Sequence, residues 1–163
     1  MKSVLRQAAV ASVAAVLLGA ASAASAAASV SYAQPDRFSD VPFTPWEREQ
    51  ILKDLTGHFN KLAARLPAGQ ELSVEVLDVD LAGQTWPTRW SGRDMRIMTG
   101  RADWPSIKLR YAITEGGQVV RSGEDELRNM SYMQGVNRYY GSDALRYEKQ
   151  MLDQWFRERI AVR

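Results

Sequence analysis

The stretch LSVEVLDVDLAG, Leu72 to Gly83, decides the fold, because its alternating Val and Leu residues predict a long β-strand that ends in a turn. The phase of this alternation changes partway along the strand. Val74 and Val76 share one face, whereas Leu77 and Val79 share the other. The strand therefore either contains a β-bulge or is covered on both sides.

A helix is predicted before this strand, beginning at Pro45 and ending before Pro67. Thr44 is placed to cap it, Pro45 suits the first helical position, and Glu47 completes a Thr-x-x-Glu capping box. Apolar residues then recur at helical spacing and form one stripe: Ile51, Leu52, Leu55, Phe59, Leu62 and Leu66. This stripe must pack on a sheet or on another helix.

Shorter strands are predicted on both sides of the central one. Val30 to Tyr32 alternates with small residues, and Met95 to Met98 has the pattern of a short strand. Ile107 to Ile113 alternates with basic residues, Gly116-Gly117 predicts a tight turn, and Val119 to Arg121 returns as the partner strand. These patterns are typical of an antiparallel hairpin.

A second helix is predicted to begin near Ser142 or Asp143. Its apolar side carries six residues: Leu145, Met151, Leu152, Trp155, Phe156 and Ile160. Glu148 falls among them, and a buried carboxylate needs a partner, which we expect to be Arg96 or Arg110. The order of elements predicts a two-layer α+β fold, with two main helices packed on a small, mainly antiparallel sheet.

The N-terminal residues 1–26 have the pattern of a secretory signal peptide. Lys2 and Arg6 precede an uncharged apolar run from Ala8 to Ala20, and small residues follow. Cleavage fits after Ala26, and sites between residues 23 and 28 also fit. The run is shorter than the roughly 20 residues that cross a membrane, so we expect residues 27–163 to form a single exported domain, periplasmic or secreted and soluble, without a membrane span.

Composition excludes several classes of function. Lys2 and Arg6 supply two of the 21 basic residues, so the chain after the leader has 19 basic and 19 acidic residues, and the net charge of +2 belongs to the leader. A neutral domain gives no support to a nucleic-acid partner. The chain has no cysteine, which excludes disulfides, thiolate metal sites and cysteine nucleophiles.

Asp78 and Asp80 lie two positions apart and form the most noticeable acidic pair. A cation such as calcium needs six to eight oxygen ligands, and this pair supplies one edge of such a site at most. We expect instead that one aspartate accepts N–H groups of the turn at residues 81–83 and that the other pairs with an arginine. The predicted polar network consists of five residues: Asp78, Asp80, Arg96, Arg110 and Glu148.

Four segments resemble one family of small exported bacterial proteins. They are YAQPDRFSDV at residues 32–41, LDVDLAG at 77–83, DWPSIKLRY at 103–111 and LRYEKQMLDQWF at 145–156. In this order they resemble domain of unknown function family 3016. The resemblance implies bacterial export and a single domain, and it supplies no activity. Asn129 stands where an aspartate is typical of the family, so no acidic role is carried over to that position.

The segment from Gln84 to Pro105 interleaves tryptophans with arginines, the residue types that dominate binding hot spots. Its candidate binding residues are Trp86, Arg89, Trp90, Arg93 and Trp104. The ligand of such a surface would be an envelope protein, a peptide or a glycan. In the alternative interpretation, the tryptophans fold back over the sheet and anchor a long loop, while the arginines neutralise the nearby carboxylates.

Complete catalytic motifs are missing from the sequence. His58 is the single histidine, and neither a nucleophile elbow, a phosphate loop nor a dinucleotide fingerprint is present. We therefore expect a non-catalytic binding or interaction domain that needs no metal and no cofactor. The alternative is a small hydrolase or a metal-dependent enzyme centred on Asp78 and Asp80.

Overall fold

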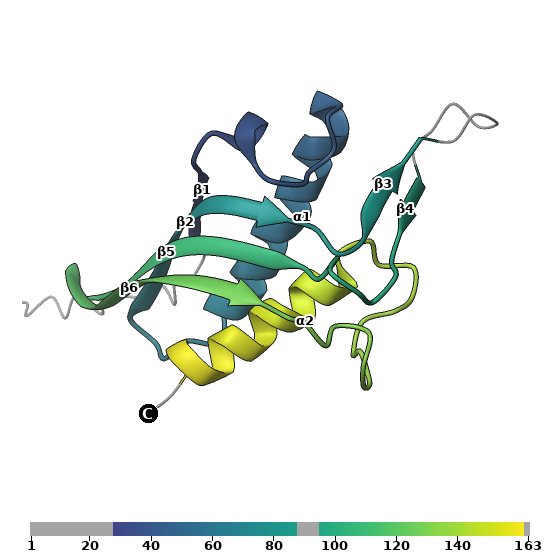
Figure 1. The fold of residues 1–163 in the computed structure, drawn as a ribbon. Helices are drawn as coiled ribbons and strands as arrows, with labels where there is room; N and C mark the ends of the chain where they lie inside the picture. Colours follow the sequence, from purple (N-terminus) through teal and green to yellow (C-terminus); the bar gives the residue numbers. More distant parts are fainter. Residues whose placement is uncertain (1–27, 88–94, 162–163) are drawn as a thin grey trace, which may run out of the picture.

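The computed structural model describes residues 28–87 and 95–161 (Figure 1). Its two main helices are α1 (Pro45–Ala63) and α2 (Arg146–Trp155), and short turns of 3-10 helix, η1 (Pro35–Arg37), and π-helix, η2 (Phe156–Ile160), accompany them. The strands are β1 (Ser29–Tyr32), β2 (Gln70–Asp80), β3 (Gln84–Trp86), β4 (Met95–Ile97), β5 (Ser106–Glu115) and β6 (Gln118–Arg128). The N-terminal leader predicted at residues 1–26 lies outside the described residues.

Four of the strands form a mixed, mostly antiparallel sheet in the order β1-β2-β5-β6, and β3 pairs with β4 in a separate hairpin. β1 runs parallel to β2, whereas the other neighbours in the large sheet are antiparallel. The predicted mixture of two main helices with mainly antiparallel strands is confirmed. The sheet is larger than the small one expected, because β2, β5 and β6 each have 10 or 11 residues.

The change of phase in β2 is a β-bulge. The pairing of β2 with β5 shifts register between Val76 and Asp78, so Leu77 is the extra residue. The bulge places Val76 and Val79 on the same buried face, although they are three positions apart. The bulge, rather than a strand covered on both sides, therefore explains the change of phase. Asp78 and Asp80 are turned away from the core.

Both helices lie on the same side of the large sheet in Figure 1. Buried side chains of α1, α2, β2 and β5 form one hydrophobic cluster, in which Leu55 and Phe59 come from α1. The helix begins at Pro45 as predicted. The capping box is not formed, because the Thr44 side chain makes no capping hydrogen bond. None of the described helices is long and apolar enough to span a membrane.

The second helix begins at Arg146, three or four residues later than expected. The Asp143 carboxylate accepts a hydrogen bond from the backbone N–H of Leu145 at 2.9 Å and also binds the Lys149 ammonium, at 2.7 and 2.8 Å. Asp143 therefore acts before the helix and fixes the turn that leads into it, rather than forming its first turn.

The inward-facing positions Gly123 and Asp125 of β6 are not apolar, and contacts with β5 and α2 replace the usual hydrophobic packing there. At Gly123, the Tyr111 ring of β5 lies over the backbone, so an added Cβ would meet ring atoms at 3.0 Å. Tyr111 in turn packs edge-on against Trp155 of α2, with ring centroids 5.5 Å apart. The Trp155 indole N–H donates to Asp125 at 2.8 Å, which satisfies the inward-facing carboxylate.

Replacing Gly123 by valine is expected to lower the free energy of unfolding by about 1–3 kcal/mol, because the new side chain must displace the Tyr111 ring. Ser122→Val is the matched control, since the neighbouring Ser122 is exposed. Chemical unfolding of both variants measures the difference. Equal stability of the two would show that Tyr111 does not need the glycine.

Candidate functional site

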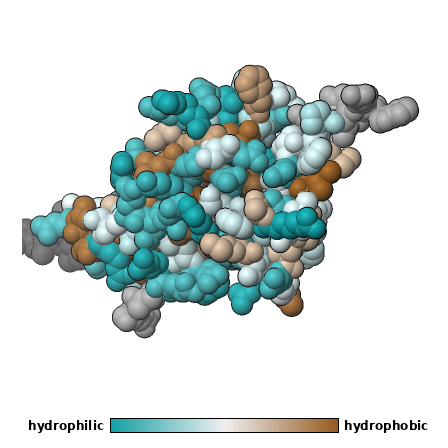
Figure 2. Space-filling view, in the orientation of Figure 1, coloured by the Kyte–Doolittle hydropathy of each residue, from teal (hydrophilic) through white to brown (hydrophobic). Residues whose placement is uncertain are grey.

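The β3–β4 hairpin stands apart from the large sheet (Figure 1). In its register Trp86 pairs with Met95 and Gln84 pairs with Ile97, so these four side chains share one face. Trp86 is 54 % exposed, Met95 56 % and Ile97 42 %. Figure 2 shows hydrophobic surface over this hairpin. An exposed group of one aromatic and two aliphatic side chains is typical of an interaction surface.

Arg96 fixes the opposite face of the hairpin. Its guanidinium pairs with both carboxylate oxygens of Asp40, at 2.8 and 3.0 Å. The same guanidinium donates to the carbonyl oxygens of Leu81, Ala82 and Gly83, at 3.1 to 3.4 Å. Arg96 and Asp40 are both largely buried, so their bidentate ion pair holds the hairpin against the end of β2. The apolar face therefore points away from the fixed side.

Gly83 explains why the stretch LDVDLAG ends in glycine. Its φ of +84° lies in the left-handed region, which other residues rarely adopt. An added Cβ would also lie 2.6 Å from the backbone oxygen of Ile97. The Gly83 N–H donates to the carbonyl of Asp103 at 2.9 Å, which ties the turn to the segment after β4. The glycine thus allows β3 to turn away sharply from β2.

Asp78 serves a structural purpose. One of its oxygens accepts the Ser39 backbone N–H at 2.7 Å, and the other accepts the Ser39 hydroxyl at 2.5 Å. Residues 38–41 also pair with the end of β2, through an isolated parallel bridge between Asp40 and Asp80. Asp78 therefore holds the segment before α1 against the sheet. We expected it to bind the turn at residues 81–83 or an arginine, and this prediction is wrong.

Asp80 has a different environment. Within the described ranges its carboxylate makes neither a hydrogen bond nor an ion pair. Burial raises its pKa above the ordinary value, the carboxylates of Asp40 and Asp78 raise it further, and Arg96 opposes them. Asp80 therefore interacts with two carboxylates and one guanidinium. Among the described residues, no group of three or more His, Cys, Asp or Glu side chains is arranged to hold a metal ion.

Glu148 is 1 % exposed, and the ion pair predicted for it is wrong. Its Oε1 accepts the backbone N–H of Ala82 at 2.8 Å, while Oε2 has no hydrogen-bond partner. Burial raises the pKa of this carboxyl above its ordinary value. Arg96 donates to the carbonyl oxygen of Leu81, which belongs to the same peptide group as the Ala82 N–H, and to the carbonyl oxygen of Ala82. The two charged groups are therefore connected through the turn and not by direct contact.

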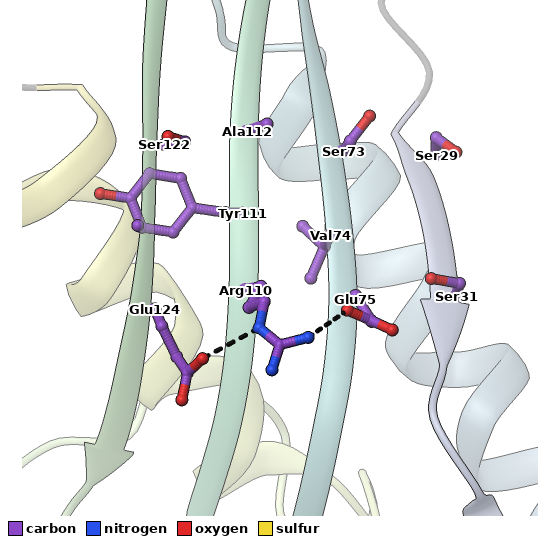
Figure 3. Close-up of a pocket in the computed structure, with 11 residues that line it drawn as sticks. Ser29, Ser31, Ser73, Val74, Glu75, Arg110, Tyr111, Ala112, Ser122 and Glu124 are labelled. Carbon is purple, nitrogen blue, oxygen red and sulfur yellow. Dashed lines mark hydrogen bonds and ion pairs between the residues drawn. The ribbon is translucent and has the colours of Figure 1, made fainter. Parts of the chain in front are cut away.

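Arg110 lies on the outer face of the large sheet, opposite to the helices. It donates to Glu124 at 2.9 Å and to Glu75 at 3.0 Å, across three neighbouring strands (Figure 3). Hydrogen bonds from Lys108 and Arg110 lower the pKa of Glu124, so that the carboxyl is held ionised. Arg110 is 56 % exposed and cannot reach Glu148, which belongs to the buried layer.

A shallow hollow of about 470 Å³ lies beside this ionic row. Its floor consists of four small residues in register across the sheet, Ser29, Ser73, Ala112 and Ser122 (Figure 3). The charges at its rim are paired with each other. Val74 and Tyr111 also line it, so the hollow combines paired charges with some apolar surface.

The predicted binding residues are separated by the structure. Trp86 is exposed on the hairpin, whereas Trp104 is half-buried against a small cluster of Ala82, Tyr132 and Tyr147. Trp104 thus fits the alternative interpretation, in which a tryptophan anchors the loop. Arg89, Trp90 and Arg93 lie outside the described residues. Sequence reasoning missed Met95 and Ile97 as part of the surface, although their alternation with Arg96 correctly predicted β4.

The family model described as "Protein of unknown function (DUF3016)" matches residues 26–158. The chain belongs to this family. The match spans the whole sheet and both helices, and so includes every element that positions the hairpin and the polar cluster of this DUF3016 member. No curated protein and no solved structure matched the chain.

Proposed function

We propose that the protein is an exported, non-catalytic binding domain of the cell envelope, and that its ligand docks on the apolar face of the β3–β4 hairpin. The observation that carries this proposal is the exposure of Trp86, Met95 and Ile97 on one face of a hairpin whose other face is fixed by Arg96. A fixed backbone lowers the entropy that binding must overcome, and exposed aromatic and thioether groups supply contact area.

The chemistry of this face favours a protein or peptide ligand over a glycan. Met95 and Ile97 present flexible and branched aliphatic groups, which suit apolar side chains of a partner. Export rests on the N-terminal pattern of residues 1–26, and the family resemblance agrees with it.

The double variant Trp86→Ala/Met95→Ala tests the proposal. We expect it to fold normally, because both side chains are exposed, and to lose a partner that crosslinks to the protein in the intact envelope. Circular dichroism with thermal unfolding measures the fold, and crosslinking followed by mass spectrometry measures the partner. Phe43→Ala/Trp46→Ala is the matched control, since it removes two exposed aromatic groups beside the start of α1. An unchanged partner profile in the hairpin variant would refute the proposed surface.

A further inference from the structure

We infer that a hollow on α1 is a second binding site, which takes a phosphate-type oxyanion. The hollow has a volume of about 450 Å³ and is lined by α1 and by Lys149 of α2. The residues that carry the argument are Lys53, Gly57, Asn60, Lys61 and Lys149. The site shares none of these residues with the hairpin surface, and the inference does not depend on the proposed function.

Charge is the first argument for an anion. Lys53 and Lys61 are exposed, lie eight positions apart and flank Gly57 on one face of α1. In the part of the chain that the structure describes, neither lysine forms an ion pair. Lys149 adds a third cation at the edge, where Asp143 binds it. One carboxylate, Asp54, also lines the hollow and accepts a hydrogen bond from Gln50 at 3.2 Å.

Gly57 is the second argument. Glycine inside a helix lowers its stability relative to alanine, so its presence calls for a reason. Close packing is not that reason, because a Cβ at Gly57 would find no heavy atom within 4 Å. The missing side chain instead leaves open space on the face of the helix that carries Lys53 and Lys61.

An unused hydrogen-bonding group is the third argument. His58 does not supply it, because its buried Nε2 faces an Asp153 oxygen at 3.2 Å. Asn60 accepts the Ala28 N–H through its side-chain oxygen at 2.9 Å, and its amide nitrogen has no partner among the described residues. The Asn60 amide and the two lysines provide donors that suit phosphate oxygens.

The same chemistry is offered by a free phosphate compound and by a phospholipid headgroup, and one experiment separates the two. Inorganic phosphate is titrated into the full protein while the amide signal of Gly57 is followed by NMR, with sodium chloride at equal ionic strength as the reference. Vesicles of phosphatidylglycerol and of phosphatidylcholine are tested by flotation. We expect saturable binding of phosphate, and binding to the phosphatidylglycerol vesicles alone would assign the site to a headgroup.

Three variants make the test specific. Lys53→Gln/Lys61→Gln is expected to weaken binding at least tenfold, whereas Lys108→Gln, on the outer face of the sheet, is expected to leave it unchanged. Gly57→Leu keeps all the lysines but fills the open space, and it should abolish binding while circular dichroism shows an intact helix. The inference is overturned if neither phosphate nor vesicles bind beyond the effect of sodium chloride. It is equally overturned if the double lysine variant binds as the natural protein does.

Discussion

Replacing Glu148 by alanine is expected to lower the free energy of unfolding by about 2–4 kcal/mol. The side chain is fully buried, and its Oε1 is the hydrogen-bond acceptor for the N–H of Ala82. Alanine would leave this N–H without a partner and would open a cavity between α2 and the turn after β2. Both consequences act in the same direction, so the loss exceeds that of an ordinary surface substitution.

Replacing Glu148 by glutamine is not expected to cause this loss of stability. Glu148→Gln keeps an oxygen for Ala82 and removes the charge that burial disfavours. Because the folded protein raises the pKa of this carboxyl above its unfolded value, its contribution to stability is full below the unfolded pKa and declines as the pH rises through the folded pKa. At pH values above the folded pKa, each unit of difference between the folded and unfolded pKa values lowers the free energy of unfolding by about 1.4 kcal/mol.

Urea unfolding of the natural protein and of the two variants, at pH 4.5 and pH 8, measures these effects. We expect the difference in stability between Glu148→Gln and the natural protein to move in favour of glutamine as the pH rises. A large loss on Glu148→Gln at pH 8 would instead indicate that the carboxylate has a cationic partner, as the sequence alone led us to expect.

Periodicity predicted the elements of this fold wherever apolar residues face the core. The stripe of α1 and the break of phase in β2 were both visible in the sequence, and the break proved to be a bulge at Leu77. β6 was underestimated because its inward positions Gly123 and Asp125 are not apolar. Their partners, the Tyr111 ring and the Trp155 indole, come from other elements, and a local pattern does not contain that information.

The polar cluster was predicted by residue type but not by pairing. Arg96 lies beside the end of the acidic stretch, yet its partner is Asp40, which precedes α1 and has no sequence pattern that marks it. Asp40 reaches Arg96 because residues 38–41 pair in parallel with the end of β2. Pairing of this kind depends on tertiary contacts between distant segments, so it follows only once the strand order is known.

Replacing Arg96 by methionine is expected to lower the free energy of unfolding by about 2–3 kcal/mol, because hydrogen bonds to charged groups are worth more than neutral ones. Methionine keeps much of the length of the side chain but donates no hydrogen bond. It would leave the largely buried Asp40 carboxylate without its cation and three carbonyl oxygens of residues 81–83 without their donor. The hairpin would then lose its attachment to β2.

Arg110→Met is the matched control for Arg96→Met, since Arg110 also lies between carboxylates but is 56 % exposed. Solvent screens its ion pairs, and we expect a clearly smaller loss than in Arg96→Met. Hydrogen exchange of the β3 and β4 amides adds a local measurement: exchange should accelerate there in Arg96→Met before the large sheet is affected. Equal losses in the two variants, with unchanged exchange in the hairpin, would mean that Arg96 does not fix the apolar face. In that case the binding surface would have to be ordered by its ligand.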